Sequence, residues 1–199
     1  MRAKIAILAS GEGANFEALV QASRQGGLEA DVVGLITNRS QIGALGRAQR
    51  LNVPARILSP KTFSSREEWD RAVMDQLQTW GAEWVVLAGF LVLMGPQTLK
   101  KYSGRMINIH PSLLPKFGGP GMFGDNVHRA VLEAKESESG VTVHFVDAAF
   151  DQGRRIAQAR VKVETTDTVE TLARRVKALE LSFYAKVVND LVTGRITTS

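Results

Sequence analysis

Short apolar runs alternate with longer amphipathic stretches through the first half of the chain. The runs favour β-structure and predict strands over residues 4–9, 31–37, 55–58, 83–88 and 105–109. Amphipathic stretches of helical length fill the gaps between them. One covers residues 64–80, where Ser64 is expected to cap the helix and Glu67 to complete a capping box. This alternation predicts βαβ units and a mostly parallel sheet with helices on both faces, a Rossmann-like three-layer α/β fold.

The pattern changes after Pro115. Residues 116–124 are rich in glycine and are expected to form a loop. A helix over 125–134, strands over 141–146 and 156–163, and a last helix over 169–191 are expected to follow. This second half is α+β in style and predicts an antiparallel C-terminal portion on the same sheet. No internal repeat or low-complexity linker divides the sequence, so we expect a single domain over residues 1–199.

Composition and charge narrow the class of protein. No apolar run approaches the roughly 20 residues that a membrane helix needs, and the N-terminus lacks a secretory signal, so we expect a cytoplasmic protein with no membrane partner. The sequence has no cysteine and three histidines, which argues against disulfides, thiolate chemistry and a metal site. The net charge of +5 suits an anionic ligand. Because no aromatic residues interleave with the basic ones, nucleic acid is not the expected partner.

The segment 106–115 carries the strongest chemical signal. Asn108 and His110 are two residues apart on a predicted strand, so their side chains share one face of the sheet. Pro111 cannot continue a sheet ladder, which puts the pair at the end of the strand, where open α/β sheets collect catalytic groups. An amide donor beside a titratable imidazole could stabilise a developing oxyanion. The alternative is a buried, hydrogen-bonded histidine beside a turn-forming asparagine.

The first strand runs into Gly11-Glu12-Gly13-Ala14-Asn15 and then a helix. Glycines at such a junction let backbone N–H groups approach an anion, and the helix N-terminus adds positive charge, so the turn predicts a phosphate site. It does not predict a dinucleotide, because that fingerprint needs glycine where Phe16 stands. A tight turn without a ligand remains the alternative.

Three further features have two interpretations each. Asp151 could reach His110, orient its ring and raise its pKa if their strands are neighbours, or it could be a surface turn residue. Residues 90–94 could floor a pocket for a flat heterocycle, or pack in the core. Arg154 and Arg155 could lower the pKa of Asp151 or point to solvent. His144 alternates with apolar neighbours and is expected to pack on the sheet.

Four motifs taken jointly give a family resemblance over nearly the whole chain. They are ASGEGAN (9–15), VVLAGF (85–90), INIHPSLLP (107–115), and SGVTVHFV (139–146) with an aspartate five residues on. In their order and spacing they resemble the glycinamide ribonucleotide transformylases, within the wider formyltetrahydrofolate-using superfamily. The resemblance implies a formyltransferase fold and transfer of a formyl group from 10-formyltetrahydrofolate to the amine of glycinamide ribonucleotide, in purine synthesis. It also implies a monomer or homodimer.

The resemblance carries over to individual positions of this sequence. It implies a catalytic trio of Asn108, His110 and Asp151. It implies that the N-terminal half binds the substrate phosphate through Gly13, Ala14 and Asn15, with Lys177 and Glu180 contacting the phosphate and the glycinamide end. It implies that the folate is held by Arg66, Phe90, Leu91, Val92, Leu93 and Met94, where Val92 replaces an arginine of some relatives. The loop 117–124 is longer than in many relatives and could be a mobile lid.

Other functions remain open from the sequence. A formyltetrahydrofolate deformylase would use the same three side chains with water as the acceptor. A non-catalytic nucleotide-phosphate or folate binder would have no need for all three. A nicotinamide oxidoreductase is suggested only by the fold class, and the missing dinucleotide fingerprint counts against it.

Overall fold

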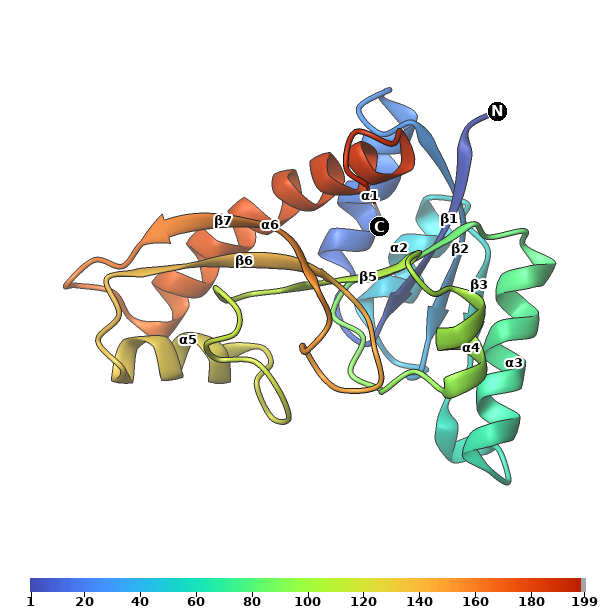
Figure 1. The fold of residues 1–199 in the computed structure, drawn as a ribbon, viewed down its shortest axis with the longest axis horizontal. Helices are drawn as coiled ribbons and strands as arrows, with labels where there is room; N and C mark the ends of the chain where they lie inside the picture. Colours follow the sequence, from blue (N-terminus) through green and yellow to red (C-terminus); the bar gives the residue numbers. More distant parts are fainter. Residues whose placement is uncertain (198–199) are drawn as a thin grey trace.

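Seven strands form one sheet in the computed structural model, which describes residues 1–197 (Figure 1). The strands are β1 (Ala3–Ala9), β2 (Ala30–Thr37), β3 (Ala55–Ile57), β4 (Trp84–Leu87), β5 (Met106–His110), β6 (Glu138–Phe145) and β7 (Arg155–Lys162). The helices are α1 (Ala14–Arg24), α2 (Gly43–Arg50), α3 (Arg66–Thr79), α4 (Pro96–Lys101), α5 (Asp125–Glu133) and α6 (Val169–Val192), with a 3₁₀ turn η1 (Pro60–Thr62).

The strand order β3-β2-β1-β4-β5-β6-β7 confirms the predicted mixed α/β architecture. The first five strands in this order run parallel, β6 is antiparallel to β5, and β7 is antiparallel to β6. The expected strand bounds hold to within one residue, except that β6 begins three residues early, at Glu138. Residues 138–140 have little strand character of their own, but they pair with Arg160–Lys162 of β7.

The predicted start of α3 is wrong by one residue. Ser65, not Ser64, is the N-cap, and its side chain accepts a hydrogen bond from the Glu68 backbone N–H at 3.1 Å. Ser64 instead contacts the Glu68 side chain. Two adjacent serines followed by two adjacent glutamates satisfy the capping pattern in two registers, and the packing of Trp69 and Val73 in the core selects the second.

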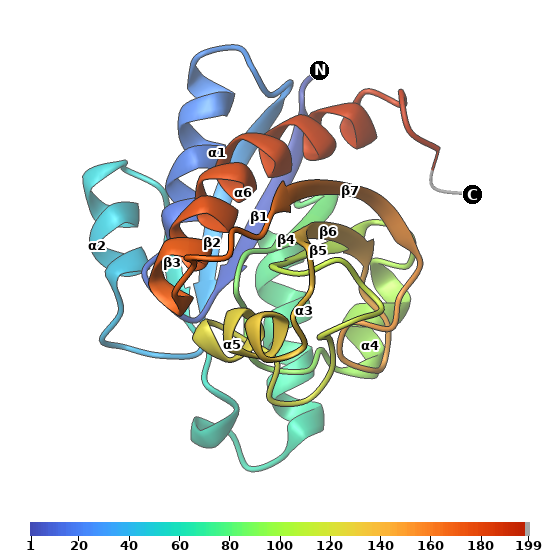
Figure 2. The same cartoon turned by 90° about the vertical axis from the view of Figure 1, so that its left-hand side faces the viewer.

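Helices cover both faces of the sheet (Figure 2). On one face, Ile5, Ile7 and Ala9 of β1 pack in a core cluster with residues of α1, α2, α5 and α6. On the other face, Ala6 and Leu8 pack with residues of α3. Side chains alternate across a strand, so a strand buried on both faces reads as a continuous apolar run, as β1 does. No helix within residues 1–197 is both long and apolar enough to cross a membrane.

The chain reverses its direction of travel across the sheet between β1 and β4. It moves outward from β1 to β3, then returns to β4 on the other side of β1. In open α/β sheets, the carboxyl ends of the strands at such a switch point form a crevice. Ser10 fixes this point: its backbone N–H donates to the Gly89 carbonyl, and its hydroxyl accepts from the Leu91 N–H, each at 3.0 Å. The ends of β1 and β4 are therefore held together.

Candidate active site

A cavity of about 880 Å³ opens at the carboxyl ends of β1, β4 and β5. Its walls also include the N-terminus of α1, the loop 119–124, residues 146–147 and 149–151 after β6, and one face of α6. This volume lies in the range of small-molecule sites. The sequence-predicted trio Asn108, His110 and Asp151 lines this cavity, and so do Gly13–Asn15, Phe90–Met94, Lys177 and Glu180.

The pairing of β5 with β6 builds the polar centre of the cavity. Asn108 and His110 share one face of β5, as predicted, and Asn108 lies directly opposite His144 of β6. Directly opposed residues of an antiparallel pair bring their side chains into contact. The Asn108 amide accordingly lies 3.0 Å from the Nε2 atom of His144. The strand ladder thus sets the position of the amide before any ligand binds.

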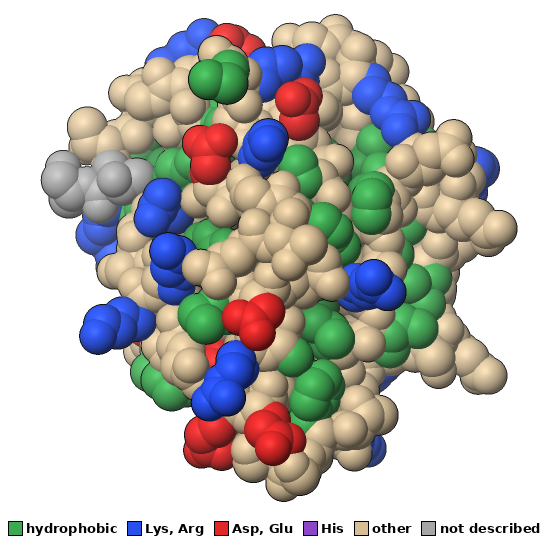
Figure 3. Space-filling model, turned by 90° about the vertical axis from the view of Figure 1, so that its right-hand side faces the viewer, with side chains coloured by type: hydrophobic (Ala, Val, Ile, Leu, Met, Phe, Trp, Pro, Cys, Tyr) green, Lys and Arg blue, Asp and Glu red, His purple; other side chains and the backbone are tan. Residues whose placement is uncertain are grey.

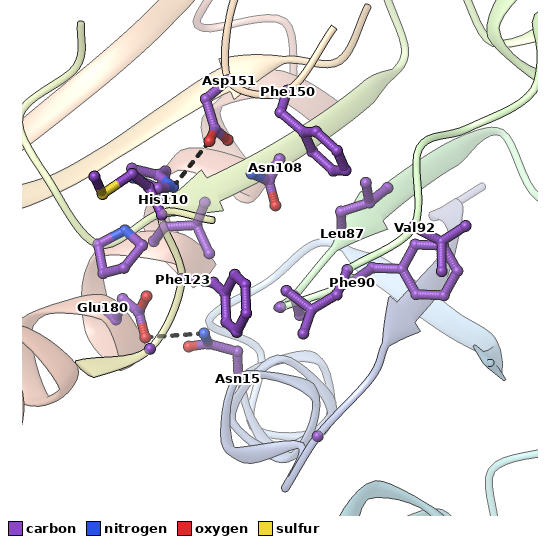
Figure 4. A pocket seen from close by; sticks show the side chains of 18 of the residues that line it. Asn15, Leu87, Phe90, Val92, Asn108, His110, Phe123, Phe150, Asp151 and Glu180 are labelled. Carbon is purple, nitrogen blue, oxygen red and sulfur yellow. Dashed lines mark hydrogen bonds and ion pairs between the residues drawn. The ribbon is translucent and has the colours of Figure 1, made fainter. Parts of the chain in front are cut away.

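The loop after β6 brings Asp151 to His110, across 41 residues of sequence. The Asp151 Oδ2 atom lies 3.4 Å from the His110 Nδ1 atom, and the two side chains are 9% and 5% exposed (Figure 4). The Gly119 backbone N–H donates to Asp151 Oδ2 at 2.9 Å. On the other side of the ring, His110 Nε2 donates to the Phe117 carbonyl at 2.8 Å. Nδ1 is therefore the ring nitrogen that faces the carboxylate.

Burial dominates the titration of His110. Desolvation lowers its pKa, and the Asp151 carboxylate and the Phe117 carbonyl only partly offset this effect. Asp151 raises the pKa of His110, as predicted, but the loss of solvation is larger and the net shift is downward. Burial raises the pKa of Asp151, yet its contacts with His144, His110 and the Gly119 N–H outweigh burial, so the carboxyl pKa lies below its usual range. Asp151 is therefore ionised at neutral pH.

His144 belongs to the site, although the sequence pattern predicts only packing on the sheet. Its ring is buried as expected, and Nδ1 lies 2.8 Å from the Phe145 carbonyl, which requires a proton on Nδ1. In the neutral ring Nε2 is then an acceptor for the Asn108 amide at 3.0 Å. The same nitrogen is 3.5 Å from Asp151 Oδ1. His144 therefore contacts both Asn108 and Asp151.

Neither arginine that follows Asp151 is among the groups with the largest effect on its pKa. Arg155 donates to the Leu114 carbonyl at 2.9 Å, and the Arg154 guanidinium lies 4.8 Å from the centre of the Phe145 ring. These contacts hold both side chains against the protein. A lowering of the Asp151 pKa by the two arginines stays a prediction.

The polar end of the cavity joins α1 to α6. Gly13 is the N-cap of α1 with φ 77°, a left-handed conformation that favours glycine, and a Cβ atom there would meet Ala44 at 2.7 Å. The Asn15 amide donates to Glu180 at 3.2 Å, and Lys177 pairs with the same carboxylate oxygen at 2.5 Å. The helix N-terminus and the Lys177 ammonium give this end of the cavity the chemistry of an anion site.

Two buried polar atoms at this end have no hydrogen-bond partner among residues 1–197. They are Asn15 Oδ1 and His128 Nδ1. His128 comes from α5 and lines the cavity, and the sequence patterns did not point to it. Burial lowers its pKa, with partial compensation from Asp125 and Glu180. Buried polar groups normally have partners, so these two atoms mark places where a ligand or water would bind.

The other end of the cavity is apolar. Phe90 and Met94 are buried, while Leu91 stays more than one-third exposed at the rim. Arg66 lies outside this cavity, in an adjoining hollow that shares Leu93 and Met94 with it. Its guanidinium donates to the Leu93 carbonyl at 2.6 Å and lies 4.3 Å from the centre of the Trp69 ring. Arg66 is thus separated from the trio, and its expected role beside a folate tail stays a prediction.

Comparisons with known proteins all indicate one family, the formyl transferases. The sequence profile of the formyl transferases matches residues 3–188. The phosphoribosylglycinamide formyltransferase of Haemophilus influenzae is 34% identical over 193 residues, which cover 97% of this chain and 89% of that protein. The crystal structure of glycinamide ribonucleotide transformylase 1 from Symbiobacterium toebii superposes with a TM-score of 0.92 at 37% identity, covering 98% of this chain and 90% of that one.

Some relatives are much longer. The trifunctional purine biosynthetic protein adenosine-3 of Bos taurus is 35% identical over 195 residues, and this chain spans 19% of its length. The matched segment includes the strands, loops and helices that line the cavity, since it covers 98% of this chain.

Proposed function

Because the chain belongs to the formyl transferase family, we propose that it transfers the formyl group of 10-formyltetrahydrofolate to the amine of glycinamide ribonucleotide. The products are N-formylglycinamide ribonucleotide and tetrahydrofolate, in purine synthesis. The observation that carries this proposal is the convergence of Asn108, His110 and Asp151 on one wall of a cavity that has an anion-binding end and an apolar end.

Attack of the amine on the formyl carbon produces a tetrahedral intermediate with a negatively charged oxygen. The Asn108 amide has two N–H donors, and only one of them is used by His144, so the other is available for this oxygen. His110 would donate through Nδ1, because Nε2 is held by the Phe117 carbonyl. Donors that are already oriented and largely excluded from water stabilise such an oxyanion strongly.

Asp151 serves the proton transfers in this proposal. The attacking amine must lose a proton and the departing N10 atom of the folate must gain one. An ionised Asp151 beside His110 can accept the proton through a water molecule and stabilise the charged ring during the reaction. The ligand-free pKa of His110 is low, so the negative charge of the intermediate would be what draws a proton onto the ring.

The two ends of the cavity would hold the two substrates. The phosphate would bind at Gly13, Ala14 and Asn15 with Lys177, and Glu180 would accept hydrogen bonds from the glycinamide end. The pterin ring would lie against residues 90–94, with backbone polar groups reading its edge. The segment 90–94 begins three residues after the end of β4, whose Leu87 pairs with Asn108, so this arrangement would place the formyl group over Asn108 of the neighbouring strand.

An assay of formyl transfer tests the proposal. A 10-formyl folate analogue is incubated with the protein, with and without glycinamide ribonucleotide, while deformylated folate, formate and formylated ribonucleotide are measured. We expect folate turnover to require the ribonucleotide, and His110→Ala to reduce turnover about 100- to 10,000-fold while both substrates still bind. Formate release that is independent of the ribonucleotide would favour a deformylase instead. Unchanged turnover in His110→Ala would remove the catalytic assignment.

A further inference from the structure

Phe123 is a large apolar side chain in an unusual place. It is 49% exposed, and it lies in a loop of glycine, proline and methionine just before α5. Exposed apolar side chains that lie together along one cavity are typical of ligand-binding grooves. Leu91, another exposed apolar residue, lines the same cavity. Phe123 is neither part of the trio nor one of the residues at the anion-binding end of the cavity.

The ring lies at the junction of the two ends of the cavity. Figure 4 shows it between the Asn15–Glu180 pair and Phe90. Phe150, from the loop that carries Asp151, lies across the space beside Asn108. If the ribonucleotide binds at Asn15 and the folate at Phe90, the Phe123 ring would lie along the seam between them, where the amine and the formyl carbon meet.

The loop is anchored at its base and has open space around its tip, where the Gly121 carbonyl accepts hydrogen bonds from the Phe123 N–H and the Asn126 side chain. At the base, Gly119 donates to Asp151 and the Phe117 carbonyl accepts from His110. At the tip, a Cβ atom added to Gly121 or Gly124 would meet nothing within 4 Å, and both residues have positive φ. The ring position is thus tied to the catalytic side chains through the loop base, while the tip has room to adjust to bound substrates.

At this seam water would compete with the amine as the nucleophile that attacks the formyl carbon. If water attacks the formyl carbon, its oxygen forms the new bond, the bond from that carbon to N10 breaks, and N10 takes a proton, giving formate and tetrahydrofolate. Asn108, His110 and Asp151 would stabilise that intermediate as well, because their contacts are with the oxyanion and not with the nucleophile. The trio therefore does not explain why the amine would be preferred.

We propose that Phe123 is a specificity-determining residue, whose ring covers the seam between the two substrates and excludes water from the formyl carbon. An aromatic ring suits this role since it fills space and neither donates nor accepts a strong hydrogen bond that could hold a water molecule. Exclusion of water from a closed site suppresses hydrolysis of reactive groups. This inference rests on the proposed function and extends it to the choice between amine and water.

The partition between transfer and hydrolysis tests this inference. Wild-type protein, Phe123→Ala and Phe123→Leu are given a 10-formyl folate analogue and saturating glycinamide ribonucleotide, and formate and formylated ribonucleotide are measured in the same reactions. We expect Phe123→Ala to raise the ratio of formate to formylated product about tenfold. Phe123→Leu, which restores an apolar side chain, should return most of the wild-type ratio.

Ile57→Ala is the matched control, since Ile57 is 48% exposed but lies on β3, outside the cavity. It should leave the ratio unchanged, and urea unfolding should give similar midpoints for all variants because both side chains are half exposed. A Phe123→Ala protein that transfers more slowly with the wild-type ratio would overturn the inference alone. A wild-type protein that forms no formylated ribonucleotide would overturn the proposed function and the inference together.

Discussion

At the residue scale, the centre of the site is a buried cluster of one carboxylate and two imidazoles. Asp151 contacts both rings, and each ring has a backbone carbonyl on its far side, from Phe117 for His110 and from Phe145 for His144. These carbonyls orient the rings, so that the nitrogens near Asp151 point to the cavity. Burial makes the charged form of His110 costly, and stability should therefore depend on pH.

We expect the free energy of unfolding to fall as the pH is lowered from 7 to 5.5. Burial lowers the folded-state pKa of His110 and of His128, so near and below their unfolded value of about 6.5 the unfolded chain binds more protons than the folded one. Each such group reduces stability by up to about 1.4 kcal/mol per pH unit within the window between its two pKa values. Below about pH 4, the lowered pKa of Asp151 adds a further loss in the same direction.

Urea unfolding at a series of pH values measures this dependence. His110→Asn removes one of the two groups and should make the stability profile shallower between pH 7 and 5.5. If the stability of the wild-type protein stayed constant or rose on acidification over this range, it would contradict the conclusion that burial lowers the folded-state pKa of His110 and His128.

Part of this site can be predicted from the sequence because it depends on local geometry. The two-residue period of a strand puts Asn108 and His110 on one face without knowledge of the fold, and the glycine turn before α1 indicates an anion site from local geometry. The sequence pattern predicts only packing for His144, because its neighbours are apolar and its polar partner Asn108 comes from cross-strand pairing with β5. His128 has no local signal, since its place in the cavity follows from how α5 packs on α6.

At the element scale, the short helix α4 depends on a residue of another helix. Gly95, its N-cap, has no side chain to cap it, and the backbone N–H groups of Gln97 and Thr98 donate to the fully buried Asp70 carboxylate of α3. A Cβ atom at Gly95 would lie 2.1 Å from the Asp70 side chain, so glycine is required there. This contact fixes the chain directly after the cavity segment 90–94. Its partners are separated by 27 residues, and no local pattern predicts it.

Two serine substitutions test which residue caps α3, Ser65 as in the structure or Ser64 as predicted from the sequence. Ser65→Ala should lower the free energy of unfolding by about 1 kcal/mol, because the Glu68 N–H loses its side-chain partner. Ser64→Ala removes only an exposed contact with the Glu68 side chain and should cost less than about 0.5 kcal/mol. The two substitutions remove the same hydroxyl group from adjacent serines, so each variant is the control for the other in urea unfolding. A larger loss in Ser64→Ala would restore the capping predicted from the sequence.

At the scale of the whole molecule, charged side chains of both signs are spread over the surface, whereas the side chains proposed to bind and react lie together in one cavity. The sequence carries a net charge of +5, but basic and acidic side chains are interspersed on the face shown in Figure 3. The anion-binding end of the cavity therefore depends on a few local groups, the N-terminus of α1 and Lys177, more than on a broad positive field. The apolar end, at residues 90–94, lies in the same cavity on a different part of the sheet.

If each substrate binds at its own end, each should stabilise the fold independently. A ligand at 100 times its Kd raises the free energy of unfolding by about 2.7 kcal/mol. We expect this gain with glycinamide ribonucleotide and with a 10-formyl folate analogue when each is added alone to the wild-type protein. Lys177→Ala removes the ammonium at the phosphate end, so at the same concentration a tenfold weaker Kd would reduce the ribonucleotide gain to about 1.4 kcal/mol. The folate gain should be unchanged.

Val92→Asp is the reciprocal variant, since it puts a charge into the apolar end and leaves the phosphate end as it is. It should lose the folate gain and keep the ribonucleotide gain, as measured by thermal or urea unfolding at fixed ligand concentrations. This crossed pattern depends on the two ends of the cavity and not on the proposed catalytic trio, because neither variant changes Asn108, His110 or Asp151. If either variant lost both gains equally, the cavity would be responding as one site, and the assignment of a nucleotide end and a folate end would be wrong.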